Sequence, residues 1–370
     1  MKRRDFLQKS TLSSALLLSS EPSSLAISPQ NTRTALPSTA QKAWMDLKFG
    51  MFVHFGINTF YDKEWSDGTL DASAFNPKAI DTDVWCATAR AAGMKYIVIT
   101  TKHHDGFCLW PSKFTDYHVG NSPFKQDVVA MLAKSAKKYD LKLGLYFSLW
   151  DRYDPTYERD WWTFLDNMFG QVEELLTQYG EITELWMDGF WKKQKNGWTK
   201  KNKDIDGEAA PEERNRQRDL NFIASWRQEG AYWWQMDALY RKVKALQPNC
   251  LVMNNSTTAY PGVPLHPVDI RSGEKYIEVA ADQKVWRWLG EDIYLPLQIE
   301  TTMSTTGNER FPSGNWFWHA DDHSVRSKEN ILQLLDVAGN MQANLLLNVG
   351  ISDKGLLRPE DTRVLSSLRG

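Results

Sequence analysis

Two acidic residues lie in apolar segments of the sequence, where a carboxylate could do chemistry. Asp188 ends the segment 182–188 shortly after Trp186, and Glu300 lies within the segment 297–302. Two carboxylates that face each other across an aromatic pocket can hydrolyse a glycosidic bond. One attacks the sugar carbon, and the other, in a more apolar setting, donates a proton to the leaving oxygen. A helix cap or an ion pair is the structural alternative for Asp188.

Polar side chains also stand at or after the ends of other apolar segments. They are histidines, a lysine, a tyrosine and further acids: His54, Lys102, His103, His104, Asp105, Tyr146 and Glu274. If these segments are parallel strands of one barrel, their carboxyl ends meet on the face where such folds place their active sites. The sequence therefore predicts that these side chains gather around one pocket.

The neighbouring residues His103 and His104 raise the alternative of a metal site. Successive side chains on a regular strand point to opposite faces, so two adjacent histidines rarely bind one ion. The first apolar segment adds only a lone His54, where a barrel metal hydrolase usually has a pair of ligands. We therefore predict no metal and no other cofactor. We expect the histidines to hydrogen-bond sugar hydroxyls, or one of the adjacent pair to be structural.

The elements that must position these residues follow from hydrophobic patterning. The predicted strands are 49–55, 95–101, 142–149, 182–188, 250–254, 268–272, 297–302 and 344–349. Most are continuous apolar runs, which indicate strands that are covered on both faces and hence a parallel sheet.

Helical patterns separate most of these strands. They are predicted at 81–92, with Asp81 as the cap and Gly93 as the stop, and at 127–138, 158–179, 221–246 and 327–341. This alternation predicts an α/β fold, a (β/α)8 TIM barrel with degenerate later helices. A doubly wound open sheet is the alternative, but no glycine-rich phosphate loop follows the first strand. The charged residues 192–220 predict a solvated insertion, or a charged helix start for their second half.

Composition excludes several classes of protein. The 370 residues carry 44 Lys and Arg against 46 Asp and Glu, and a net charge of −2 argues against a nucleic-acid binder held by bulk charge. No stretch approaches the ~20 apolar residues of a membrane span. Cys86, Cys108 and Cys250 form neither a disulfide framework nor a zinc pair. The 17 tryptophans either stack on sugar faces or fill the core.

The amino-terminal residues are typical of an export signal rather than of a fold. Arg3 and Arg4, followed by Phe6, Leu7 and Lys9, resemble a twin-arginine signal, and a short apolar stretch and a Ser/Pro-rich segment come next. We therefore expect residues 1–30 to be an export signal and linker, residues 31–370 to be the catalytic barrel, and the protein to be periplasmic. A basic tail is the alternative.

Several motifs together resemble a known family. They lie at 48–56, 64–65, 100–110, 144–148, 185–189, 299–302 and 345–350, in order over residues 44–350. The run Thr101-Lys102-His103-His104-Asp105-Gly106-Phe107 is the most specific of them. On these motifs the chain resembles glycoside hydrolase family 29, the retaining exo-acting α-L-fucosidases, which implies a barrel fold and a fucosylated glycan as substrate.

The resemblance also implies roles for particular residues. Asp188 matches the nucleophile, Glu300 falls at the general acid/base, with Ile299 in place of the usual Trp, and Glu274 is the runner-up for that role. Positions that match contacts to the fucose ring and hydroxyls are His54, Glu64, Trp65, His103, His104, Tyr146 and Trp186. An aromatic wall and imidazole partners suit L-fucose, which has an apolar C6 methyl group and three ring hydroxyls.

The chain departs from the family pattern at two places. Where members often carry a basic residue after the fifth strand, the sequence has Asn254-Asn255-Ser256, and Arg271 is a candidate substitute for substrate binding. The family commonly adds a C-terminal β-sandwich, which we do not expect before Gly370. Two alternatives stay open: a related enzyme for another sugar such as an α-L-galactoside, and a non-catalytic fucose-binding barrel.

Overall fold

A computed structural model describes residues 35–189, 233–255, 267–274, 282–305 and 314–368. The expected export signal at 1–30, the charged segment 192–220 and the first part of the helix expected at 221–246 lie outside these ranges. Those expectations therefore stay predictions.

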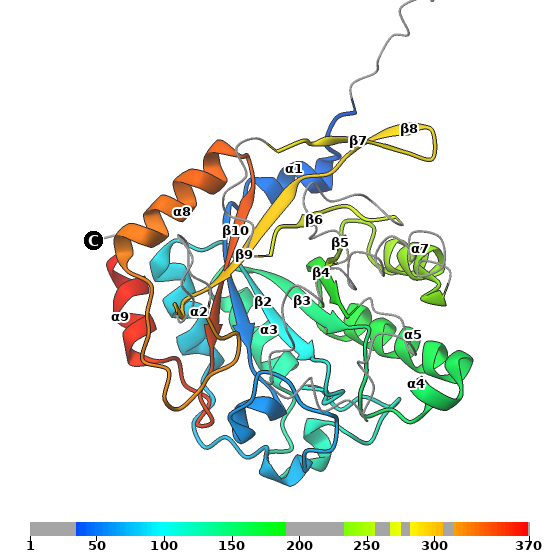
Figure 1. The fold of residues 1–370 in the computed structure, drawn as a ribbon, viewed down its shortest axis with the longest axis vertical. Coiled ribbons are helices and arrows are strands. Elements are labelled where there is room, and N and C mark those ends of the chain that lie inside the picture. The colour runs from blue at the N-terminus through cyan, green and yellow to red at the C-terminus, as the bar shows by residue number, and fades with distance from the viewer. Residues whose placement is uncertain (1–34, 190–232, 256–266, 275–281, 306–313, 369–370) are drawn as a thin grey trace, which may run out of the picture. The chain divides into compact units, whose positions relative to one another are not determined.

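Eight parallel strands form the main sheet, in the order β5-β4-β3-β2-β1-β10-β9-β6 (Figure 1). They are β1 (Phe49–His54), β2 (Tyr96–Lys102), β3 (Lys142–Ser148), β4 (Ile182–Asp188), β5 (Leu251–Asn254), β6 (Arg271–Ser272), β9 (Leu297–Thr302) and β10 (Asn344–Gly350). A parallel bridge between Met253 and Ile270 links β5 to the residues that lead into β6, so the sheet closes almost completely. The predicted (β/α)8 barrel is confirmed.

The helices of the described ranges lie mostly between successive strands (Figure 1). They are α1 (Thr39–Met45), α2 (Thr82–Ala92), α3 (Val128–Lys138), α4 (Thr156–Arg159), α5 (Trp161–Gln178), α7 (Met236–Leu246), α8 (Lys328–Asn340) and α9 (Pro359–Ser367). Asp81 caps α2 by accepting the N–H groups of Asp83 and Val84, and Gly93 ends it at φ 94°, as predicted. Within these ranges no helix has the length and apolarity that a membrane crossing needs.

Some elements differ from the expected ones. The helix expected at 158–179 is divided at Asp160, whose side chain caps α5. The sixth strand, expected at 268–272, is reduced to the two residues of β6. Between β6 and β9 the described residues form no helix but an antiparallel hairpin, β7 (Val285–Trp288) and β8 (Glu291–Tyr294). Neither this hairpin nor α1 and α9 were predicted.

Both faces of the strands are buried, which explains their continuous apolar runs. On β1, Met51 and Val53 pack in the cluster between the sheet and its helices, whereas Phe52 packs inside the barrel. The inner cluster comprises Trp44, Phe52, Tyr96, Val98, Tyr146, Trp186, Leu251, Met253, Ile270 and Leu346. The barrel interior is therefore a packed core on which a site at one end can rest.

Helix α1 closes the amino-terminal end of the barrel. Its Trp44 is buried and donates its indole N–H to Glu184, and Gln298 donates to the same carboxyl group at 3.1 Å. Burial raises the pKa of Glu184 to about 7. This polar layer lies below the inward side chain of Trp186, which follows Glu184 by two residues on β4.

Candidate active site

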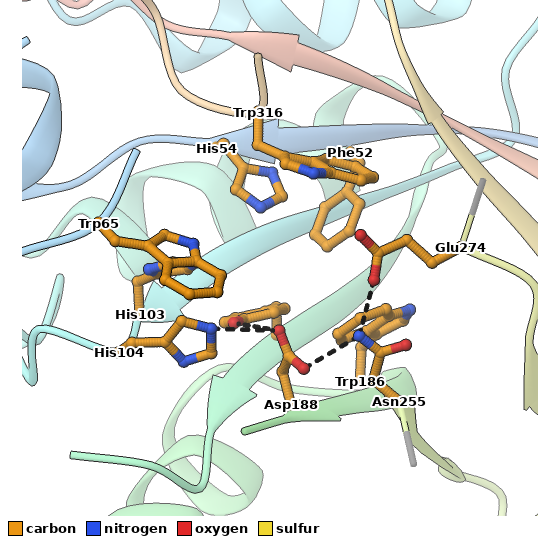
Figure 2. Close-up of a pocket in the computed structure, with 11 residues that line it drawn as sticks. Phe52, His54, Trp65, His103, His104, Trp186, Asp188, Asn255, Glu274 and Trp316 are labelled. Carbon is orange, nitrogen blue, oxygen red and sulfur yellow. Dashed lines mark hydrogen bonds and ion pairs between the residues drawn. The ribbon is translucent and has the colours of Figure 1, made fainter. Parts of the chain in front are cut away.

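A pocket of about 480 Å³, counted with its open mouth, lies at the carboxyl ends of the barrel strands (Figure 2). Among the described residues it is lined by Phe52, His54, Trp65, His103, His104, Tyr146, Trp186, Asp188, Asn255, Glu274 and Trp316. The predicted gathering of polar and aromatic side chains at the strand ends is thus present for most of the expected residues.

Asp188, the last residue of β4, points into this pocket (Figure 2). Its Oδ2 accepts a hydrogen bond from the Tyr146 hydroxyl at 2.9 Å and lies 3.5 Å from His104 Nε2. Its Oδ1 accepts from the Gly189 N–H at 2.8 Å and from the Asn255 amide at 3.0 Å. Burial raises the pKa of Asp188 above its ordinary value, while the hydrogen bonds lower it and so favour the charged carboxylate.

Glu274 supplies the second carboxyl group of the pocket, two residues after the end of β6. Asn255 joins the two acids, because its Nδ2 also donates to Glu274 Oε2 at 2.9 Å (Figure 2). Since this nitrogen is 3.0 Å from Asp188 Oδ1 and 2.9 Å from Glu274 Oε2, those two oxygens lie no more than 5.9 Å apart. The pocket therefore contains a close pair of carboxyl groups.

Glu300, which was expected to converge with Asp188, is not among the described residues that line this pocket. Its side chain is 0% exposed and lies two residues before the end of β9, below the layer of side chains that faces the pocket. Its Oε2 accepts hydrogen bonds from Ser272 Oγ at 3.1 Å and from the Gly273 N–H at 3.0 Å. Its Oε1 accepts from the Trp186 indole at 3.3 Å.

The three histidines of the pocket are held as neutral imidazoles. Burial lowers the pKa of His54 and of His104 to about 3, and burial together with the other two histidines lowers that of His103 well below its ordinary value. His54 Nδ1 lies 2.6 Å from Asn348 Oδ1, and the Asn348 amide donates to the Trp316 carbonyl. His54 therefore carries its proton on Nδ1 and can accept a hydroxyl proton at Nε2.

Aromatic rings form the walls around these polar groups. Tyr146 stacks on Trp186, with ring centroids 5.2 Å apart, and on its other side packs against His103 at 5.6 Å. Trp316 packs near His54 at 5.1 Å, and Trp65 meets the edge of His104 at 5.4 Å. An aromatic wall with neutral imidazoles suits a ligand that has both apolar faces and hydroxyl groups.

Glu64, which was expected to be a sugar ligand, is not among the described residues that line the pocket. Its carboxylate accepts the backbone N–H groups of Trp316 and Phe317, at 3.1 and 2.9 Å, and lies 3.0 Å from His319 Nε2. Asp62 approaches the other nitrogen of His319 at 3.0 Å. This acid–histidine clamp, made of Asp62, Glu64 and His319, fixes the loop that carries Trp316.

The acid–histidine clamp is expected to make a pH-dependent contribution to the stability of the folded protein. The hydrogen bond to Glu64 raises the pKa of His319 above its ordinary value. A histidine whose pKa is raised on folding stabilises the folded state fully below about pH 6.5 and loses that contribution as the pH rises through the folded pKa. His319→Gln is therefore expected to cost more unfolding free energy at about pH 5.5 than at about pH 9.5, by ~1 kcal/mol or less.

Urea unfolding of both proteins at the two pH values measures this difference. His323→Gln, at an exposed position on the same loop, is the matched control and is expected to change stability little at either pH. An equal cost of His319→Gln at both pH values would contradict an ionised clamp.

Arg271, which was expected to be a sugar ligand, is also not among the described residues that line the pocket. Its guanidinium forms an ion pair with Asp282 and lies 5.1 Å from the Trp286 ring of the hairpin. The next residue, Ser272, points into the barrel, because neighbouring side chains of a strand point to opposite faces. Arg271 thus joins the barrel to the hairpin.

Eight residues named from the sequence do line the pocket: His54, Trp65, His103, His104, Tyr146, Trp186, Asp188 and Glu274. Phe52, Asn255 and Trp316 were not among the predicted site residues. Phe52 precedes His54 by two residues and so shares its face of β1, which is a signal that the sequence contained. Asn255 directly follows β5 at a carboxyl end.

This fold and this site define a class of protein: a (β/α)8 barrel whose pocket combines paired carboxyl groups, neutral histidines and aromatic walls, as barrel glycoside hydrolases do. A model of the α-L-fucosidase family matches residues 69–369. The chain belongs to this family, glycoside hydrolase family 29.

Individual relatives agree with this assignment. A protein of Arabidopsis thaliana named alpha-L-fucosidase 1 is 33% identical, over 89% of this chain and 59% of its own length. The crystal structure of a glycoside hydrolase 29 family member from an unknown rumen bacterium has a TM-score of 0.71 and 27% identity, over 91% of this chain and 57% of that one. Alpha-L-fucosidase isoenzyme 1 from Paenibacillus thiaminolyticus has a TM-score of 0.65 and 25% identity, over 89% and 74%. The chain thus spans about three fifths of the length of the plant relative.

Proposed function

We propose that this protein is an exo-acting retaining α-L-fucosidase that removes terminal α-L-fucose from glycans. The observation that carries the proposal is the pair of Asp188 and Glu274, joined by the Asn255 amide inside one pocket. Asp188 is the nucleophile, as the sequence suggested. Glu274, the runner-up in the sequence, takes the role of general acid/base from Glu300.

The separation of the two carboxyl groups supports retention of configuration. Retaining glycosidases hold their carboxyl groups about 5–5.5 Å apart, whereas inverting enzymes separate them by about 6.5–9.5 Å to admit a water molecule. The oxygens of Asp188 and Glu274 that Asn255 bridges are at most 5.9 Å apart, since Asn255 Nδ2 lies 3.0 and 2.9 Å from them. This upper bound is below the range of inverting enzymes and so favours a retaining mechanism.

Two displacements follow from this geometry. In the first, Asp188 Oδ forms a bond to the anomeric carbon as the bond to the leaving oxygen breaks, and Glu274 transfers its proton to that oxygen. In the second, Glu274 takes a proton from water, whose oxygen bonds to the anomeric carbon as the bond to Asp188 breaks. The products are the free alcohol of the glycan and L-fucose, and both acids return to their first states.

The walls of the pocket support fucose as the sugar. The neutral imidazoles of His54, His103 and His104 can donate to or accept from ring hydroxyls without the cost of burying a charge. The rings of Phe52 and Trp316 offer apolar surface for a methyl group. The names of the relatives above point to the same substrate class.

Hydrolysis of an aryl α-L-fucoside, followed by proton NMR, tests the proposal. The wild-type protein is expected to release α-L-fucose first, before mutarotation, and to prefer the fucoside to the matching α-L-galactoside. Initial release of the β-anomer would contradict retention, and a preference for the galactoside would identify another sugar as substrate. Binding of L-fucose in a calorimeter with no hydrolysis would instead indicate a sugar-binding protein.

A further inference from the structure

Glu300 is a buried carboxyl group that the proposed double displacement does not use. It is 0% exposed inside the barrel, yet its oxygens contact both sides of the active site. On one side it accepts hydrogen bonds from Ser272 and Gly273, which directly precede Glu274. On the other side it accepts from Trp186, which lines the pocket.

The contact with Trp186 links Glu300 to the nucleophile. Trp186 stacks on Tyr146, with ring centroids 5.2 Å apart, and the Tyr146 hydroxyl donates to Asp188 at 2.9 Å. The ring of Trp186 is therefore fixed by Glu300 at its indole N–H and by Tyr146 at its face. A shift of Glu300 would be transmitted to this stack.

The contact with Ser272 links Glu300 to the amide between the two acids. Ser272 Oγ lies 3.1 Å from Glu300 Oε2 and 3.1 Å from Asn255 Oδ1. The orientation of the Asn255 amide is fixed, because its Nδ2 donates to both Asp188 and Glu274. Its oxygen must then face Ser272 and accept the hydroxyl proton.

The hydroxyl of Ser272 bridges Glu300 and the Asn255 amide. Its Oγ donates towards both Glu300 Oε2 and Asn255 Oδ1, each at 3.1 Å. Glu300 thus accepts hydrogen bonds from Ser272, Gly273 and Trp186. Burial raises the pKa of Glu300 well above its ordinary value, while the hydrogen bonds from Trp186 and Ser272 lower it.

We propose that Glu300 is a positioning residue for the general acid/base. From below the pocket it holds the Ser272–Gly273 segment that carries Glu274, orients Asn255 through Ser272, and fixes Trp186 beside Asp188. This inference rests on the proposed function, in which Glu274 is the acid/base. Glu300 itself exchanges no proton with the substrate.

Two substitutions at Glu300 test the proposal against leaving groups of different quality. Glu300→Ala removes all three contacts and is expected to lower kcat/KM for phenyl α-L-fucoside about 10²-fold, since a catalytic group displaced by about 1 Å loses about that much. The loss is expected to be only a few-fold for 2-chloro-4-nitrophenyl α-L-fucoside, whose leaving group needs little protonation. Glu300→Gln keeps an acceptor oxygen for Ser272 and Gly273 but faces the Trp186 indole with an N–H, so it is expected to recover most of the activity.

Glu184→Gln is the matched control. Glu184 is equally buried inside the barrel, but its carboxyl group contacts Trp44 and Gln298 rather than the segment of Glu274. This variant is expected to keep kcat/KM on both substrates within about threefold, in the range of a substitution that leaves the site intact. Thermal unfolding of each variant separates loss of fold from loss of position, and Glu300→Gln keeps the test valid if Glu300→Ala does not fold.

A double-mutant cycle completes the experiment. If Glu300 acts through Glu274, Glu300→Ala is expected to have almost no effect on phenyl α-L-fucoside in a Glu274→Ala background. Equal losses on both substrates, or additive losses in the cycle, would overturn the positioning role. Formation of α-L-fucosyl azide by Glu300→Ala, but not by Glu274→Ala, would overturn it by making Glu300 the acid/base. Absence of hydrolysis by the wild-type protein would overturn the proposed function itself.

Discussion

Replacing Asp188 with alanine is expected to lower kcat/KM for an aryl α-L-fucoside by about 10⁴-fold. Losses of about this size are typical when a nucleophilic side chain is removed from an active site. Asp188 is the carboxylate that the pocket prepares for attack. Its two oxygens accept hydrogen bonds from Tyr146, Asn255 and the Gly189 N–H, all of which favour the charged form. No other described side chain offers a carboxylate at this position in the pocket.

Asp188→Asn is the matched variant for this experiment. The amide keeps the shape of the side chain but cannot attack the anomeric carbon, so the same loss is expected without a change in packing. Azide is expected to restore turnover to Asp188→Ala by occupying the vacated space and to give β-L-fucosyl azide, the product of a single inversion. Wild-type turnover by either variant would remove Asp188 from the mechanism.

The barrel could be predicted because its strands carry a strong local signal. A strand covered on both faces needs apolar residues at nearly every position, and segments such as 95–101 and 344–349 have this pattern. The hairpin of β7 and β8 lacked such a signal. Its turn places Leu289 at φ 48° and Gly290 at φ 87°, and leucine is not a residue that predicts a left-handed turn.

Site residues could be predicted where their position along a strand determines whether they face the pocket. His54 and Asp188 end their strands, and the rule for barrels places both at the active end. Glu300 shows the limit of this rule. Its strand continues to Thr302, so an inward side chain two residues earlier lies one layer lower in the barrel. The sequence contained this offset, because the strand predicted at 297–302 also continues two residues beyond Glu300.

Other roles depend on contacts that are distant along the chain. The carboxylate of Glu64 binds the loop at 316–319, about 250 residues further along the chain. A local sequence pattern cannot predict a contact over that distance. Arg271 and Ser272 lie on opposite faces of a two-residue strand. So short a strand shows no periodicity in its sequence, so the sequence could not predict which of the two side chains points into the barrel. The fold was therefore more predictable than the partners of individual charged side chains.

Glu274→Ala is expected to separate substrates by their leaving groups. A general acid contributes about 10²–10⁴-fold when the leaving oxygen needs a proton. We therefore expect kcat/KM for phenyl α-L-fucoside to fall by about that factor, and kcat/KM for 2-chloro-4-nitrophenyl α-L-fucoside to fall far less. On the activated substrate kcat and KM are expected to fall together, because removal of the fucosyl group from Asp188 then becomes slow without a base.

Azide distinguishes Glu274 from Glu300 directly. In Glu274→Ala the small anion can reach the fucosyl-enzyme through the space that the side chain leaves and attack without a general base, giving α-L-fucosyl azide by two inversions. The same anion has no such space at Glu300, which is 0% exposed and lies beneath the pocket. A uniform loss on both substrates, with no azide product, would mean that Glu274 holds the sugar rather than moves the proton. The Asn255 amide would then join the nucleophile to a binding residue, and the acid would have to come from another side chain at the pocket.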